Sequence, residues 1–395
     1  MTSDVVERAR RAVALVFVVN GLVFASWLSR LPAVRDALGL STSALGLLLL
    51  CLSAGSVAGL PLSGPVVARL GAARTVLSGA GVVGIGMLLV ATGVRTQQLA
   101  PTGLGLALTG LGIASWDVAM NVEAADVERR LGRTLMPRFH AGFSIGTVGG
   151  ALLGAAAAAL SVGVPAQLAV TSVAAVAVVA HLVRAFLPVH ADQQAGPRLA
   201  ASQAWREPRT LLVGLLVLCF AFTEGTANEW LAVALVDGHG TSEAIGALGF
   251  ACFVVAMTAS RTVGGALLER YGRPAVLRAT AVLSVAGLLL VVLATSLPLV
   301  LAGALLWGAG AALGFPVGMS AAADDPYGAA VRVSVVSSIG YTAFLAGPPL
   351  IGLLAEPERL GVLPALLVVL VALLVGAAVA GRTAPQARLA VPARR

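Results

Sequence analysis

The sequence predicts an all-α polytopic membrane protein with twelve transmembrane helices, arranged as two six-helix pseudo-repeat halves. Three observations predict it: apolar stretches fill almost the whole chain, arginines fall on alternate loops, and short motifs recur in both halves. Of the 395 residues, 58% are hydrophobic and only 11% are charged, whereas soluble domains carry about 25% charged residues. Lipid can cover this much apolar surface, and a single aqueous core cannot.

Each apolar stretch is long enough to cross a bilayer, which takes about 20 residues in a helix. Backbone groups in lipid must be bonded within the protein, which leaves helices or a closed barrel. The stretches are too long and too uniformly apolar for barrel strands. The predicted spans are 12–32, 43–68, 75–94, 99–124, 139–160, 163–187, 209–236, 242–267, 275–295, 298–322, 333–355 and 361–381.

The basic residues predict the orientation. All 26 are arginine. If the N-terminus is cytoplasmic, twenty-one of them lie in cytoplasmic segments, Arg30, Arg35, Arg95 and Arg359 lie outside, and Arg261 lies within a span. This is a strong positive-inside bias. We therefore expect a multi-pass protein of the cell (inner) membrane with both termini in the cytoplasm. The net charge of +8 is explained by orientation and by contact with anionic membrane lipids, and it does not indicate nucleic-acid binding.

Four short motifs recur in the same order, which predicts two repeats of one six-helix unit. Gly64-Pro-Val-Val-Ala-Arg69-Leu-Gly71 matches Gly265-Ala-Leu-Leu-Glu-Arg-Tyr-Gly272, and the other pairs are Ser43–Gly46 with Glu243–Gly246, Gly110–Gly112 with Gly308–Gly310, and Ser144–Gly146 with Ser338–Gly340. The longest polar link divides the chain between them. We expect halves at 1–187 and 209–395, joined by a cytoplasmic linker at 188–208.

A six-plus-six repeat with a basic glycine-bounded loop after the second helix of each half resembles the major facilitator superfamily. The resemblance implies that the loops help to close the inward gate. It points to the residues Arg69, Gly71, Arg74, Glu269, Arg270 and Gly272. The first loop has Ala68 where the family has an acid, so Glu269 is the better candidate for the gate latch. The resemblance also implies a monomer.

A finer resemblance lies in the fourth span. Asp117-Val-Ala-Met-Asn121 is similar to the Glu-x3-Asn signature of fucose–proton symporters, and residues 117–144 resemble the uncharacterised inner-membrane facilitators of the YbjJ type. The fucose symporters also carry an acid in their first helix. The first span of this chain, with Asn20 as its candidate cavity residue, has none, so two-carboxylate proton chemistry in the first half is not implied.

Asp117 is the foremost candidate for proton coupling. A carboxylate inside the membrane is costly, by roughly 2.5–3.5 kcal/mol on insertion scales, and usually faces a bundle interior or a wet cavity. Asn121 lies one turn further on the same helix face, and Trp116 offers a surface on which a flat ligand stacks. The alternative is that Asp117 only forms a structural hydrogen bond to a neighbouring helix. The repeat places apolar Phe315 and Met319 at the matching positions.

The seventh span carries a second polar cluster. Glu224 and Asn228 share a helix face, and the family arrangement of helices 1, 4, 7 and 10 predicts that they face Asp117. Glu224 is a candidate second proton or substrate ligand, and Asn228 a cavity residue. Glu229 is a further cavity candidate, although an acid near the rim is equally explained by hydration or by a gate.

Other charged residues have more than one explanation. Arg261 pairs either with Glu269 or with an acid on another helix, unless it binds an anionic ligand. His140 is a proton relay or a hydrogen-bond partner of Asn121 or Glu123. The mixed run from Glu123 to Arg133 is a solvated loop or an inward-gate network.

Several soluble chemistries are excluded. Gly79-x-Gly81-x-x-Gly84 and Gly142-x-Ser144-x-Gly146 fit nucleotide-binding and nucleophile motifs, but both lie inside apolar spans without the strands those motifs need. Cys51, Cys219 and Cys252 lie in spans without disulfide or metal spacing. We therefore expect neither an enzyme nor a cofactor.

The sequence favours a secondary active transporter of a small polar organic solute, such as a sugar or a related metabolite, coupled to protons by alternating access. The alternative is a proton-coupled efflux antiporter for lipophilic compounds or metabolites, against which the low aromatic content of 5% argues modestly. A membrane sensor or enzyme on the same scaffold has no soluble domain or nucleophile–base pair to support it.

Overall fold

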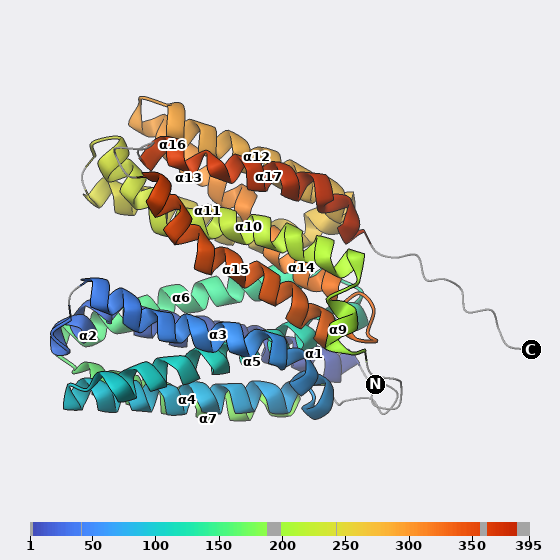
Figure 1. The fold of residues 1–395 in the computed structure, drawn as a ribbon. Coiled ribbons are helices and arrows are strands. Elements are labelled where there is room, and N and C mark those ends of the chain that lie inside the picture. Colours follow the sequence, from blue (N-terminus) through green and yellow to red (C-terminus); the bar gives the residue numbers. More distant parts are fainter. Residues whose placement is uncertain (1–2, 41, 188–198, 242, 356–361, 385–395) are drawn as a thin grey trace, which may run out of the picture.

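The computed structural model describes residues 3–40, 42–187, 199–241, 243–355 and 362–384. This part of the chain is helical, without strands, and forms two bundles (Figure 1). Within it, eleven helical segments are long and apolar enough to cross a membrane. The eleventh predicted span forms a further helix, α15 (Ala329–Ala355). The prediction of a polytopic, all-α membrane protein is confirmed.

The first bundle follows the predicted spans, with longer helices at several ends. Its spanning helices are α1 (Ser3–Leu28), α3 (Thr42–Leu70), α4 (Ala72–Thr96), α5 (Leu99–Leu131), α6 (Met136–Ala159) and α7 (Val164–Leu182), followed by the short turn η1 (Val183–Ala185). A short helix, α2 (Leu31–Ala37), precedes α3. α5 runs past the predicted end of the fourth span, so the charged run from Glu123 to Arg130 belongs to a helix rather than to a loop, and Arg133 follows the helix.

In the second bundle, the tenth span is divided into α13 (Leu297–Ala311) and α14 (Gly314–Ala322), and the twelfth into α16 (Val362–Leu366) and α17 (Val368–Val379). The other elements of this bundle are α10 (Pro208–Val233), the π-helical turn η2 (Ala234–Gly238), α11 (Glu243–Tyr271), α12 (Arg273–Leu293), α15 and η3 (Ala380–Thr383). In the linker, α9 (Ala201–Ala204) packs against α15 and α3, and residues 188–198 lie outside the described residues.

Repeated glycines explain why both bundles pack alike. A Cβ on Gly110 would lie 2.0 Å from a backbone oxygen of α3, and one on Gly308 would lie 2.1 Å from a backbone oxygen of α11. Two residues further on, Gly112 meets the backbone of α4 and Gly310 that of α12. Small residues let helices approach closely in lipid, so the matched glycines set the same helix pairs in each half.

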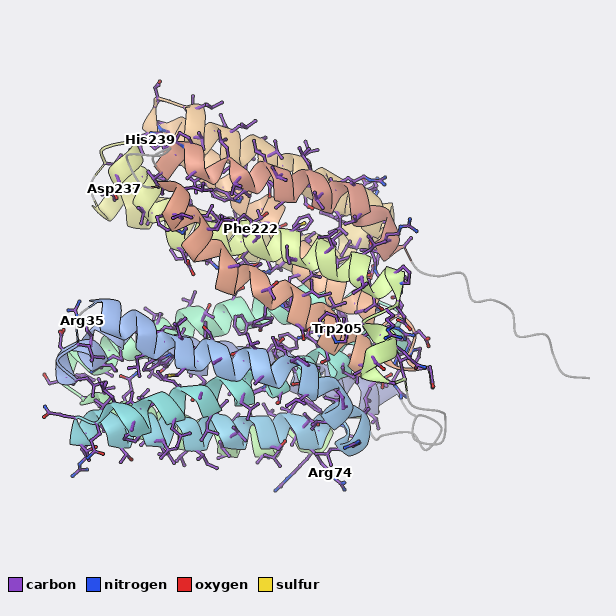
Figure 2. The ribbon with its side chains drawn as sticks, in the orientation of Figure 1. Arg35, Arg74, Trp205, Phe222, Asp237 and His239 are labelled. Atoms are coloured by element: carbon purple, nitrogen blue, oxygen red, sulfur yellow. The ribbon has the colours of Figure 1, made fainter. Side chains whose placement is uncertain are left out.

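The two bundles meet at one end of the molecule and separate toward the other (Figure 1). We call the end with α9 and the start of α1 the terminal end, and the other the opposite end. Figure 2 shows Arg35, Asp237 and His239 at the opposite end, and Arg74 and Trp205 at the terminal end. The seam between the bundles is formed chiefly by α3 with α15 and by α6 with α11.

Candidate functional site

Asp117 lies on α5 where the two bundles meet. It is 6% exposed. Asn121, one helical turn further, donates from Nδ2 to the Asp117 carbonyl oxygen at 2.9 Å and to its Oδ1 at 3.3 Å. From the second bundle, the Tyr341 hydroxyl on α15 interacts with the Asp117 carboxyl group. Asp117 forms no ion pair with any residue that the structure describes, so a buried carboxylate stands here without a counter-charge.

His140 continues this chain of contacts within the first bundle. Its Nε2 lies 3.1 Å from Asn121 Oδ1, which confirms the predicted contact with Asn121. The His140 ring also packs edge-to-face on Phe315 of α14, with ring centroids 5.5 Å apart, and Phe315 contacts Tyr341 at 6.1 Å. An aromatic bridge therefore crosses the seam beside Asp117. The repeat partner of Asp117, apolar Phe315, occupies that bridge.

Arg261 joins three elements through one buried guanidinium. It is 4% exposed. Its Nη2 bonds Glu224 Oε2 on α10 at 2.8 Å, its Nη1 donates to Ser144 Oγ on α6 at 3.0 Å, and its Nε donates to the Ala312 carbonyl at 3.1 Å. The partner acid is thus Glu224 on another helix, and not Glu269. The Ser144 contact is a direct hydrogen bond between the two bundles.

These contacts make one continuous cluster at the seam. Ser144 donates to the His140 carbonyl at 3.2 Å, and Tyr341 is also within electrostatic reach of Glu224. We call it the central polar cluster, and its members are Asp117, Asn121, His140, Ser144, Glu224, Arg261 and Tyr341. Most of these residues were predicted from the sequence, but Ser144 as a partner of Arg261 and Tyr341 were not. Tyr341 was missed because it lies in a span that also carries several serines and a threonine.

The other predicted cavity residues are placed differently. Asn228 and Glu229 are exposed on α10. Asn20 is buried on α1, and its Nδ2 has no hydrogen-bond partner. Trp116 is 1% exposed and leaves α5 beside Gly79 of α4. In this conformation its ring belongs to the core of the first bundle and does not border the space between the bundles.

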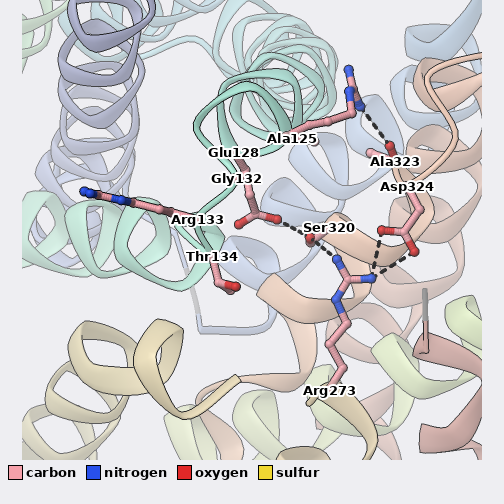
Figure 3. A pocket seen from close by; sticks show the side chains of 10 residues that line it. Ala125, Glu128, Gly132, Arg133, Thr134, Arg273, Ser320, Ala323 and Asp324 are labelled. Carbon is pink, nitrogen blue, oxygen red and sulfur yellow. Dashed lines mark hydrogen bonds and ion pairs between the residues drawn. The ribbon is translucent and has the colours of Figure 1, made fainter. Parts of the chain in front are cut away.

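A polar network closes the seam at the terminal end around a cavity of about 220 Å³ (Figure 3). Ser320 of the second bundle donates to Glu128 of the first. Arg273 donates to Ser320 at 2.7 Å and to both oxygens of Asp324 at 2.8 and 2.9 Å. Arg129 donates to the Ala323 carbonyl at 3.2 Å. The alternative of a solvated loop for the mixed run is therefore wrong, because Glu128 and Arg129 take part in contacts between the bundles.

The start of α6 is held by two carboxylates. Glu128 Oε2 accepts the Leu135 and Met136 backbone N–H groups at 2.6 and 2.7 Å. Glu269, from the second bundle, accepts the Thr134 N–H at 2.6 Å. Free N–H groups at a helix start favour negative charge. The acid retained in the second glycine-bounded loop thus bridges the two bundles.

The remaining loop residues have simpler settings. Gly71 and Gly272 adopt φ of 80° and 77°, immediately before α4 and α12, a backbone conformation that glycine adopts without strain. Arg69 and Arg74 are exposed. Arg270 lies over the Tyr271 ring at 5.1 Å. The loop glycines therefore set the turn, whereas Glu269 makes the contact across the seam.

Glu123 is buried in α5 and accepts the Leu187 N–H at 2.6 Å, which ties the end of the first bundle to the helix that carries Asp117. Within the described residues, no three His, Cys, Asp or Glu side chains are arranged to hold a metal ion.

Comparison with known proteins places this architecture in a family. A family model described as Major Facilitator Superfamily matches residues 213–395. The uncharacterized transporter y4wD of Sinorhizobium fredii is 37% identical over 88% of this chain and 91% of its own length. An uncharacterized MFS-type transporter of Yersinia pestis is 30% identical over 88% of this chain and 89% of its own length.

Solved structures share the fold at low identity. The transporter FucP in the outward conformation matches with a TM-score of 0.81 at 16% identity, over 95% of this chain and 99% of its own. A bacterial homologue of the iron transporter ferroportin in an outward-facing state matches with a TM-score of 0.76 at 14% identity, over 95% and 99% of the chains. Taken with the relatives in sequence, the twelve-helix architecture shows that this chain belongs to the major facilitator superfamily of membrane transporters.

Proposed function

We propose that this chain is a secondary active transporter of a small polar organic solute, such as a sugar or a related metabolite, driven by protons through alternating access. The observation that carries the proposal is Asp117, a buried carboxylate without a counter-charge where the two halves meet. Ionisable groups inside membrane proteins mark proton and substrate pathways. Asp117 is the main protonation site in this proposal.

The charges of the central polar cluster support one exchangeable proton. With both acids ionised, Asp117 and Glu224 contribute two negative charges and Arg261 contributes one positive charge. Glu224 forms an ion pair with the Arg261 guanidinium at 2.8 Å, whereas the Asp117 carboxyl group interacts only with the Asn121 amide and the Tyr341 hydroxyl. A buried ionised carboxylate that is not paired is strongly disfavoured. Binding one proton therefore brings the net charge of these three groups to zero. Asp117 is the expected site of that proton, because protonation removes its unpaired buried charge.

Unused hydrogen-bonding capacity supports a polar substrate. Among the described residues, the buried side-chain atoms without a partner lie almost entirely on α1, α5, α10 and α13, the first and fourth spans of each half. These atoms belong to Asn20, Trp27, Trp116, Asp117, Thr226, Trp230 and Trp307, with Arg30 Nε just beyond α1. Buried polar groups are normally hydrogen-bonded, so Asn20, Asp117 and Thr226 have donor or acceptor capacity left for a polar solute or water. Asn121, Asn228 and Glu229 are further proposed contacts, whereas the buried position of Trp116 does not support a stacking role in this state.

The arrangement of the two bundles fits one state of an alternating-access cycle. If the termini are cytoplasmic, as the arginine distribution predicts, the closed terminal end faces inward and the separated end faces outward. The contacts of Glu128 with Ser320, of Glu269 with Thr134 and of Arg261 with Ser144 then hold the inward gate shut. Rocking one half against the other breaks these contacts and opens the inner side.

The first experiment is a ligand screen by thermal shift of the purified protein. The panel contains sugars, sugar acids, amino acids and lipophilic cations. A ligand at 100 times its Kd stabilises the protein by about 2.7 kcal/mol. A polar hit is then tested for uphill uptake into proteoliposomes with an imposed pH gradient. A hit among lipophilic cations alone would instead favour efflux of lipophilic compounds.

Orientation is tested separately with single cysteines in a cysteine-free background. Arg35→Cys and Arg74→Cys place a thiol at opposite ends (Figure 2). We expect a membrane-impermeant maleimide added to intact cells to label position 35 and not position 74. The reverse pattern would overturn the assignment of the closed end to the cytoplasm.

A further inference from the structure

The tenth span is broken where a proline removes a helical hydrogen bond. α13 ends at Ala311 and α14 begins at Gly314, with Pro316 in its first turn. A prolyl nitrogen carries no hydrogen, so it cannot bond the carbonyl four residues earlier, which is that of Ala312. Within a membrane, a freed carbonyl needs another donor from the protein.

α11 donates to two carbonyl groups at the break. Arg261 Nε donates to the Ala312 carbonyl at 3.1 Å, and the neighbouring Ser260 hydroxyl donates to the Ala309 carbonyl at 2.9 Å. The guanidinium that completes the broken span is the same one that binds Glu224 and, across the seam, Ser144. Its N–H groups are fixed in one planar fork, so these three contacts cannot move independently.

The break lies directly against the central polar cluster. Phe315, the second residue of α14, packs on His140 of the first bundle and on Tyr341 of α15, with centroid distances of 5.5 and 6.1 Å. A change in the bend between α13 and α14 therefore moves Phe315 against Tyr341, which interacts with Asp117, and against His140, which contacts Asn121.

We propose that Arg261 is a positioning residue that couples the charge on Glu224 to the bend of the tenth span and to the seam between the halves. The inference rests on the proposed function, because opening of the inward gate breaks the Arg261–Ser144 contact and so requires Arg261 to move. With Glu224 ionised, the ion pair fixes the position of the Arg261 guanidinium, and its Nε donates to the Ala312 carbonyl. With Glu224 neutralised, the ion pair is lost and the guanidinium is free to leave both Ala312 and Ser144.

The titratable groups that face Arg261 and Glu224 come from three further elements. They are Asp117 of α5, His140 of α6 and Tyr341 of α15, each within electrostatic reach of a cluster member. A pH effect alone would not distinguish them from Glu224. The test therefore uses substitutions that change one partner of Arg261 at a time.

The test measures the bend directly by spin-label distances, without a transport substrate. Labels at Leu299→Cys on α13 and Tyr327→Cys beyond α14, both exposed (51% and 44%), report the bend in a cysteine-free background. We expect Glu224→Gln to move the distance distribution away from that of the parent. Pro316→Ala restores an N–H for the Ala312 carbonyl without changing any charge, so we expect Glu224→Gln to have no further effect in that background. Pro298→Ala, at the start of the same span, is the matched control and should leave the response to Glu224→Gln intact.

Two results would overturn the inference. One is a parent-like distribution in Glu224→Gln, and the other is an equal response to Glu224→Gln with and without Pro316. If Glu224→Gln does not fold because Arg261 is left unpaired, the charge-balanced double variant with Arg261→Gln takes its place, and the same shift is expected. Failure of proton-driven uptake to depend on Asp117 would refute the proposed function but leave the bend measurement valid, so the two failures are distinguishable.

Discussion

Glu269→Ala should weaken the closed inward gate by an amount that the structure allows us to estimate. Glu269 accepts the Thr134 N–H at 2.6 Å across the seam. Hydrogen bonds to charged groups contribute about 1.5–3 kcal/mol. Because this contact is exposed, we take the lower end, about 1.5 kcal/mol. Since about 1.4 kcal/mol is a factor of ten in an equilibrium constant, the ratio of inward-closed to inward-open molecules should fall roughly tenfold. Glu269→Gln keeps an acceptor oxygen and should have a smaller effect.

The assay is the distance between spin labels at Arg35→Cys and Asp237→Cys, which lie at the opposite end on different bundles (Figure 2). Opening the terminal end closes this end, so Glu269→Ala should increase the population at short distance. Glu7→Gln is the matched control, because Glu7 forms its ion pair with Arg10 within α1. An unchanged distribution in Glu269→Ala, or an equal change in Glu7→Gln, would refute the role of Glu269 as a latch.

Three further predictions concern single side chains. The hydrogen bond from Arg332 holds the pKa of Glu207 below its ordinary value of 4.5. A lowered pKa stabilises the fold only while the carboxylate is ionised. Glu207→Gln should therefore lower the Tm at pH 7, by the equivalent of about 0.5 kcal/mol for this partly exposed pair. The difference in Tm between parent and variant should vanish as the pH falls well below 4.5, and a difference that persists there contradicts the assignment. Gly146→Ala places a Cβ 2.0 Å from a backbone oxygen of α1 and should cost about 1–3 kcal/mol, whereas Gly81→Ala enters open space and should not destabilise; equal Tm values in detergent would argue against the packing account. Tyr341→Phe keeps the ring contact with α14 but removes the hydroxyl that faces the central carboxyl group, so proton-driven uptake should slow while the Tm falls by no more than the equivalent of about 1 kcal/mol; unchanged uptake would exclude the hydroxyl from coupling.

The architecture was predictable because it follows from features of the sequence that do not depend on tertiary packing. Span length, the distribution of arginines and the order of the repeated motifs depend only on the sequence. The contact of His140 with Asn121 was among the predicted alternatives, because the two residues lie near the facing ends of adjacent spans. The roles of Gly110 and Gly308 follow from the repeat.

Other features depend on tertiary geometry that the sequence leaves open. Arg261 was expected to pair with Glu269 or with an acid on another helix, and its pairing with Glu224 depends on how α10 and α11 pack. Trp116 is the neighbour of Asp117 in the sequence, so its side chain leaves α5 about 100° around the helix axis from that of Asp117. This rotation places the Trp116 ring in the core beside α4. The break before Pro316 was missed because the tenth span is apolar on both sides of it. The charged run from Glu123 looked like a loop because a helix that leaves the membrane loses its apolar pattern before it ends.

The most direct test of the central claim is uphill uptake by Asp117→Asn. The parent and the variant are reconstituted into proteoliposomes, and accumulation of a polar hit from the thermal-shift screen is followed under an imposed inward proton gradient. If Asp117 binds the coupled proton, the parent accumulates the solute and the variant does not, while exchange of labelled for unlabelled solute partly survives in the variant. Uphill accumulation by Asp117→Asn at the rate of the parent would contradict the account.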